Sequence, residues 1–80
     1  MTVRPLILVT AADCHLCGHA HGVLEALGVE ARELDVDSDE ASALAERGVA
    51  LAFLPVLTDG DEVVAYGRFS ERRLRKDLGL

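Results

Sequence analysis

The two cysteines of this chain, Cys14 and Cys17, lie between two periodic segments, and that position limits the folds that it can adopt. They follow an apolar run with β-branched members, Pro5-Leu6-Ile7-Leu8-Val9-Thr10, which is typical of a strand covered on both faces. After them, apolar residues recur at helical spacing to about Leu27, and Gly28 stands where a left-handed helix cap is expected. A C-x-x-C pair between a first strand and a helix favours redox chemistry over a zinc knuckle.

The rest of the chain predicts a second strand, a short second helix, a β-hairpin and a final helix. Serines and acidic residues precede the helical segments, and Asp59-Gly60-Asp61 is a typical hairpin turn. The expected segments are Ala31 to Asp37, Ser38 to Gly48, Leu54 to Thr58, Glu62 to Tyr66 and Ser70 to Gly79. The order β-α-β-α-β-β-α predicts an α/β fold, with a four-stranded mixed sheet and three helices on its faces.

Length and charge restrict the class of protein. With 80 residues, the chain is expected to form a single domain over 1–80. Its formal net charge of -6 argues against nucleic-acid binding, which needs an excess of clustered cations. The apolar stretch from Leu6 to Val9 is too short for a membrane span or a signal-peptide core. We therefore expect a cytoplasmic monomer without a membrane partner.

The spacing of the two cysteines assigns them different roles. A thiol at a helix N-terminus faces unpaired backbone N–H groups and the positive end of the helix dipole, and both favour the thiolate. Cys14 is expected there, after Asp13 as the N-cap residue, and is the predicted nucleophile. Cys17, one turn further, is the predicted resolving thiol. His15, when protonated, would stabilise the Cys14 thiolate, whereas the charge of Asp13 would oppose it.

The chain resembles a glutaredoxin-like protein of the thioredoxin superfamily over nearly its whole length. The resemblance is carried by the element order and by three segments, Cys14-His15-Leu16-Cys17, Leu54-Pro55-Val56 and Gly67-Arg68-Phe69-Ser70. It implies a thioredoxin-like fold and a dithiol-disulfide cycle that reduces a disulfide-containing protein or a small-molecule disulfide. It also implies a cis peptide bond before Pro55, beside the cysteine pair, with the backbone of Leu54 pairing with the substrate chain.

No bound cofactor is expected, and the resemblance leaves the electron donor open. Glutathione-binding members carry paired glycines followed by an acidic residue, and of this pattern only Gly67 is present. The segment Thr10 to Asp13 also lacks the cation that meets a glutathione carboxylate. The alternatives are glutathione, with Arg68 or Arg72 in place of that cation, and a reductase.

A metal-binding or iron-sulfur-bridging module is the alternative from another class, because Cys14, Cys17, His19 and His21 crowd one short segment. Helical geometry argues against one metal ion bound by all four side chains, since His19 points away from Cys17 and His21 is almost two turns from Cys14. Cys17 and His21 share a helix face, and Cys14 could bridge a cluster between two chains.

Most of the cations are concentrated near the C-terminus. Five of the eight Lys and Arg residues are Arg68, Arg72, Arg73, Arg75 and Lys76, whereas the segment Glu30 to Glu40 is strongly acidic. Such clusters are usually solvated faces, and the alternative is a docking surface for an acidic partner.

Overall fold

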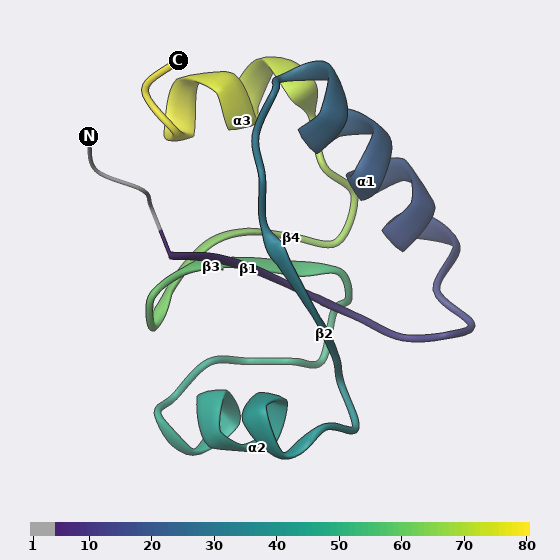
Figure 1. Cartoon of the computed structure of the whole chain (residues 1–80), viewed down its shortest axis with the longest axis vertical. Coiled ribbons are helices and arrows are strands. Elements are labelled where there is room, and N and C mark those ends of the chain that lie inside the picture. Colours follow the sequence, from purple (N-terminus) through teal and green to yellow (C-terminus); the bar gives the residue numbers. More distant parts are fainter. Residues whose placement is uncertain (1–4) are drawn as a thin grey trace.

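The computed structural model describes residues 5–80, which form one four-stranded mixed sheet with helices on both faces (Figure 1). The strands stand in the order β2-β1-β3-β4; β1 pairs in parallel with β2, and the other pairs are antiparallel. The elements are β1 (Leu6–Thr10), α1 (His15–Ala26), β2 (Arg32–Asp35), α2 (Asp39–Glu46), β3 (Val56–Asp59), β4 (Glu62–Tyr66) and α3 (Glu71–Asp77). The element order and the mixed sheet predicted from the sequence are confirmed.

Strand β1 is buried on both faces of the sheet. Leu8 and Val9 are neighbours in the chain, so their side chains point to opposite faces, and they are 1% and 0% exposed. A strand with one wet face would alternate apolar and polar residues, and β1 does not. The unbroken apolar run in the sequence therefore reflects a strand that serves two cores.

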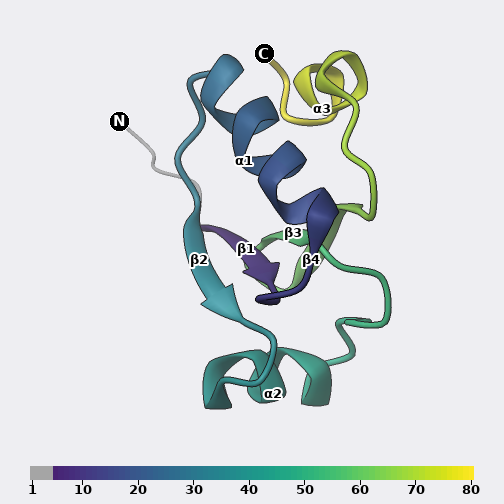
Figure 2. The same ribbon diagram turned by 90° about the vertical axis from the view of Figure 1, so that its right-hand side faces the viewer.

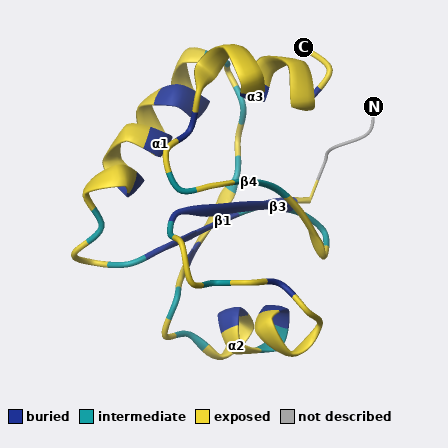
Figure 3. Ribbon diagram, turned by 180° about the vertical axis from the view of Figure 1, so that it is seen from behind, coloured by how far each residue is buried: buried dark blue, intermediate teal, exposed yellow. Residues whose placement is uncertain are grey.

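The two cores lie on opposite sides of the sheet. Helices α1 and α3 cover one face and α2 covers the other, as Figures 1 and 3 show from opposite directions. Leu8 belongs to the core under α1 and α3, together with Leu24, Leu57, Phe69 and Leu74. Val9 belongs to the core over α2, together with Leu34, Leu44 and Val56. Burying a side chain of this size contributes about 1.5–3 kcal/mol, so the two cores hold the helices firmly on β1.

The helix starts differ in their capping. The hydroxyls of Ser38 and Ser70 each accept a hydrogen bond from the backbone N–H three residues further on, at the starts of α2 and α3. The N-cap residue of α1 is Cys14, and its side chain makes no capping hydrogen bond. The prediction that Asp13 caps this helix is therefore wrong, because the helix begins one residue later than such a cap requires.

Strands β2 and β3 are shorter than predicted, for local reasons. After Asp35 the chain turns, because its carboxylate accepts the N–H of Asp37 and its carbonyl accepts the N–H of Ser38. At β3, the predicted start at Leu54 moves to Val56. Pro55, which has no N–H to donate to the sheet, stays outside the strand.

The β3–β4 hairpin closes through Gly60, which has a φ of 65°. A positive φ of this size suits glycine, which lacks the Cβ that makes the conformation costly. The pairing shifts register between Leu57 and Thr58, which marks a β-bulge. Arg47, just after α2, donates to the carboxylate of Asp61 at 2.6 Å and ties the hairpin turn to that helix.

Among residues 5–80, no helix is long and apolar enough to span a membrane.

An ion pair joins β2 to α2 at the surface. The guanidinium of Arg32 donates to both carboxylate oxygens of Glu40. This hydrogen bonding, with a smaller part from charge attraction, lowers the pKa of the Glu40 carboxyl. A lowered folded-state pKa stabilises the fold above the unfolded-state value, and this stabilisation is lost as pH falls through the folded value. Because both groups are exposed to solvent, the contribution is small.

The hydroxyl of Thr58 is fully buried in β3 and has no hydrogen-bond partner within the part of the chain that the structure describes. A buried polar group without a partner costs about 1–3 kcal/mol. We therefore expect Thr58→Val to raise the free energy of unfolding by about 1 kcal/mol, measured by urea denaturation. Thr10→Val is the matched control, because the Thr10 hydroxyl donates to Glu33 at 2.9 Å and its loss should be destabilising. A Thr58→Val protein less stable than the wild type would contradict this reading of the core.

Candidate active site

Cys14 and Cys17 are joined by a disulfide at the start of α1. Their Cα atoms are 5.3 Å apart. Cys14 is half-buried at the N-cap, and Cys17 is 5% exposed, one turn inside the helix. The Cys17 N–H donates to the Cys14 carbonyl at 3.3 Å, and the Cys14 N–H donates to the Ala11 carbonyl at 3.2 Å. Two consecutive turns therefore bring the chain from β1 into the helix with the sulfurs side by side.

No side chain caps the start of α1, and the acidic residue nearest to it, Asp13, lies outside the helix. Its N-cap side chain makes no capping hydrogen bond, and its first turn contains no acidic residue. The first N–H groups of a helix lack partners within the helix and carry a partial positive charge. In the reduced protein, these groups favour a thiolate at Cys14.

Three segments far apart in the sequence meet at the end of the sheet from which the chain leaves β1 toward Cys14 and Cys17, which we call the dithiol end. Val9 near the end of β1 pairs with Val56 at the start of β3, and Val56 pairs with Tyr66 at the end of β4. The connection from β1 to α1 therefore leaves the sheet at the same end as the residues around Pro55 and Gly67. In Figure 1 these strand ends lie at the right of the sheet, and Figure 2 looks at the molecule from that side.

The segment before β3 is held in place at this end. Pro55 is buried, Leu54 is half-buried, and the peptide bond between them is cis. The Pro55 carbonyl accepts the Gly67 N–H at 2.9 Å, which continues the β3–β4 contact beyond the last ladder pair. The structure thus brings the second predicted segment, Leu54-Pro55, to the sheet end that leads to the cysteines.

The two predicted tuning residues flank Cys14 and are exposed. Asp13 lies in the turn before the helix, and His15 is the first residue of α1. Neither side chain has an ion pair within residues 5–80. Each is in direct contact with solvent, so its electrostatic effect on Cys14 is screened by salt.

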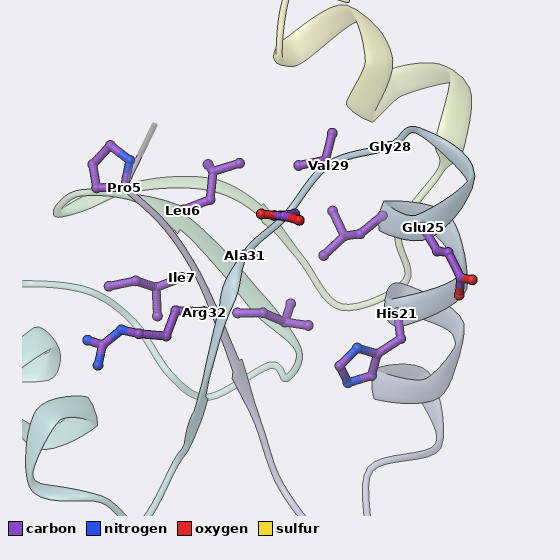
Figure 4. A pocket seen from close by; sticks show the side chains of 12 residues that line it. Pro5, Leu6, Ile7, His21, Glu25, Gly28, Val29, Ala31 and Arg32 are labelled. Atoms are coloured by element: carbon purple, nitrogen blue, oxygen red, sulfur yellow. The ribbon is translucent and has the colours of Figure 1, made fainter. Parts of the chain in front are cut away.

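The other two histidines of α1 are engaged in contacts that the sequence did not indicate. A ring nitrogen of His19 is 2.8 Å from the Phe69 carbonyl, and the Nε2 of His21 is 3.2 Å from the Glu33 carboxylate. No group of three or more His, Cys, Asp or Glu side chains within residues 5–80 is arranged to hold a metal ion. The two histidine contacts connect α1 to the segment before α3 and to β2. Figure 4 shows His21 on α1 facing the strand that carries Arg32.

An exposed aromatic pair at this end was missed by the sequence analysis. The rings of Phe53 and Tyr66 have centroids 6.3 Å apart and planes inclined by 38°. They are 68% and 63% exposed. The one signal in the sequence was that Phe53 stands just before the Leu54-Pro55 segment; its proximity to Tyr66 follows from the pairing of β3 with β4.

Comparison with known proteins identifies the fold. No protein-family model matches the chain, and no curated protein matches it. Among solved structures, the crystal structure of the thioredoxin-like protein BC3987 is similar, with a TM-score of 0.63 and 24% sequence identity. The match covers 90% of this chain and 97% of that one. The fold is therefore thioredoxin-like, as the sequence resemblance predicted.

The different burial of the two sulfurs predicts unequal reactivity in the reduced protein. We expect iodoacetamide at neutral pH to modify Cys14 at least about tenfold faster than Cys17, because Cys14 is more exposed and faces the helix N-terminus. Mass mapping of briefly alkylated protein measures both rates. In denaturant the two rates should converge. Equal rates in the folded protein would mean that position in the helix does not distinguish the thiols.

The charges beside Cys14 should change its reactivity in opposite directions. We expect Asp13→Asn to increase the alkylation rate of Cys14, because a neighbouring negative charge disfavours the thiolate. His15→Gln should decrease the rate, since it removes an imidazole that is positively charged when protonated. Both differences should shrink at high ionic strength. If both variants react at the wild-type rate at low salt, this electrostatic role of Asp13 and His15 is excluded.

Proposed function

We propose that the protein is a glutaredoxin-like thiol-disulfide oxidoreductase that reduces protein or small-molecule disulfides through Cys14 and Cys17. The observation that carries the proposal is the disulfide between an uncapped helix start and a buried residue one turn inside it, on a thioredoxin-like fold. A bridge across three residues closes too small a loop to stabilise a fold much. A reversible role explains its position better than a structural one.

The proposed reaction is a sequence of two thiol-disulfide exchanges. The Cys14 thiolate attacks one sulfur of the substrate disulfide, a mixed disulfide forms, and the other substrate sulfur leaves as a thiolate. The Cys17 thiolate then attacks the Cys14 sulfur and releases the second substrate sulfur. Two electrons pass to the substrate, which becomes two thiols after taking up two protons, and the protein is left with the Cys14–Cys17 disulfide.

The burial of the two residues supports these roles. A half-buried Cys14 can be reached by a substrate sulfur, whereas Cys17 is 5% exposed and is better placed to attack a sulfur already attached to Cys14. The shared end of β1, β3 and β4 supports Leu54 and Pro55 as substrate-binding residues. In this proposal the Leu54 backbone pairs with an extended substrate segment.

The cycle requires an electron donor that returns the disulfide to the dithiol form. Glutathione and a reductase are the two candidate donors. Arg68, exposed after Gly67, is a cation available to a glutathione carboxylate. Reduction of a test disulfide by the pure protein, with glutathione and with thioredoxin reductase supplied in separate reactions, tests the function and identifies the donor class.

The metal-binding alternative is not favoured by the side-chain contacts. His19 contacts the Phe69 carbonyl and His21 pairs with Glu33, so both histidines that the alternative needs have other partners. The zinc content of protein purified under reducing conditions tests it directly. Stoichiometric zinc bound through Cys14 and Cys17 would replace the oxidoreductase proposal.

The assigned roles predict different outcomes for the two cysteine variants. We expect Cys14→Ser to abolish disulfide reduction, because no other group performs the first attack. Cys17→Ser should retain partial activity toward small mixed disulfides, which need only that attack, and should accumulate a mixed disulfide with protein substrates. Turnover and mass spectrometry of the trapped species measure these effects. Equal residual activity in the two variants would contradict the roles.

A further inference from the structure

The aromatic pair beside the dithiol end has the character of a contact surface. Phe53 and Tyr66 are large, more than three-fifths exposed, and adjacent to each other. Isolated exposed apolar residues are ordinary, but adjacent aromatic rings offer a large, rigid area that binds at little cost in conformational entropy. The register places Tyr66 opposite Val56, so the pair stands next to the segment proposed to bind substrate.

A hollow continues from the aromatic pair along the outer strand. It lies between β4 and α3, has a volume of about 430 Å³, and is lined by apolar residues that include Tyr66, Phe69 and Leu74. Arg68 and Arg73 line it as well. Arg68 has no ion pair within residues 5–80, and the contact of Arg73 with Asp77 is long, at 3.9 Å. Arg68 is therefore available to a carboxylate of a partner, whereas Arg73 has to exchange Asp77, which also lines the hollow, for such a carboxylate.

This hollow is on the cationic part of an acidic molecule. Five of the eight Lys and Arg residues lie between Arg68 and Lys76, although the chain has a net charge of -6. An acidic partner is therefore attracted to this part of the surface and repelled from most of the remainder. Such steering orients a partner before contact, with its acidic part toward α3.

We propose that the Phe53–Tyr66 pair and the arginine-lined hollow bind a disulfide-containing polypeptide that has an apolar residue beside its cysteine and carboxylates further along. The apolar side chain rests on the two rings, and the carboxylates meet Arg68 and Arg73. The inference rests on the proposed dithiol exchange and names its substrate class. The chemistry is the same pair of exchanges through Cys14 and Cys17.

A pair of synthetic peptide disulfides of equal length provides the test. In one, leucine adjoins the cysteine and two glutamates follow; in the other, serine and two glutamines take those positions. The wild-type protein is reduced beforehand, freed of reductant and mixed with each peptide, so that no electron donor is needed. We expect the apolar, acidic peptide to react at least about tenfold faster, and its advantage to fall as ionic strength rises.

Variants separate the two parts of the surface. Phe53→Ser and Tyr66→Ser should each reduce the rate with the apolar peptide by about fivefold to tenfold and leave its salt dependence unchanged. Arg68→Gln should weaken the salt dependence, because it removes one of the two arginines that meet the carboxylates. Leu80→Ser is the control for the rings, because Leu80 is 61% exposed and outside the hollow. Arg32→Gln is the control for charge, because Arg32 lies on β2, outside the cationic segment, and pairs with Glu40; neither control should change the rates. Thermal unfolding confirms that each variant is folded.

The outcomes distinguish this inference from the function on which it rests. If the wild-type protein reduces neither peptide nor glutathione disulfide, the proposed oxidoreductase function fails. If it reduces both peptides at the same rate, the function stands and the proposed docking surface is wrong. If Arg68→Gln slows glutathione disulfide as much as the acidic peptide, while Phe53→Ser affects neither, the hollow binds a small acidic disulfide and the polypeptide proposal is overturned.

Discussion

Burial of β1 on both faces is the constraint on which the position of the dithiol depends. The Leu8 side chain packs in the core under α1 and α3, and the side chain of the next residue, Val9, packs in the core over α2. Because the strand is clamped from both sides, its last residue has a defined position and direction. The turn from Thr10 to Cys14 starts from that position, so the start of α1 is placed at the end of the sheet where β3 begins and β4 ends.

The chemistry of the site then arises from what the helix start lacks. Helices α2 and α3 have serine hydroxyls at their N-caps, but α1 has the sulfur of Cys14 and no capping hydrogen bond. A side-chain cap stabilises a helix by about 1 kcal/mol, and α1 goes without it. The Cys17 N–H donates to the Cys14 carbonyl instead, and the other N–H groups of the first turn, which have no partner within a helix, favour a thiolate in the reduced protein. Stability is thus exchanged for reactivity at one residue, while the cores secure the rest of the helix.

Recognition in the proposed function uses groups outside the cysteine motif. The aromatic pair comes from the segment before β3 and the end of β4. Of the two arginines, Arg68 lies in the segment before α3 and Arg73 in the first turn of that helix. The apolar rings supply contact area, and the arginines supply orientation and attraction over a longer range. A substrate that satisfies both groups is held at the same end of the sheet as Cys14. The fold thereby separates the reacting residues from those that select the partner.

The sequence by itself determined the element order, the cap at Ser70, the turn at Gly60 and the position of the cysteine pair, because these depend on neighbours a few residues away. For the cap of α2 it left Asp37 and Ser38 open, and the structure has Ser38. It misplaced the cap of α1 at Asp13 and the start of β3 at Leu54, since propensity does not show where a hydrogen-bonded turn or ladder begins. Only the tertiary structure decided that His19 contacts Phe69, that Thr58 is buried without a partner within residues 5–80, and that Phe53 meets Tyr66. Such contacts depend on strand register and helix packing, in which residues distant in the chain become neighbours only when the whole core has formed.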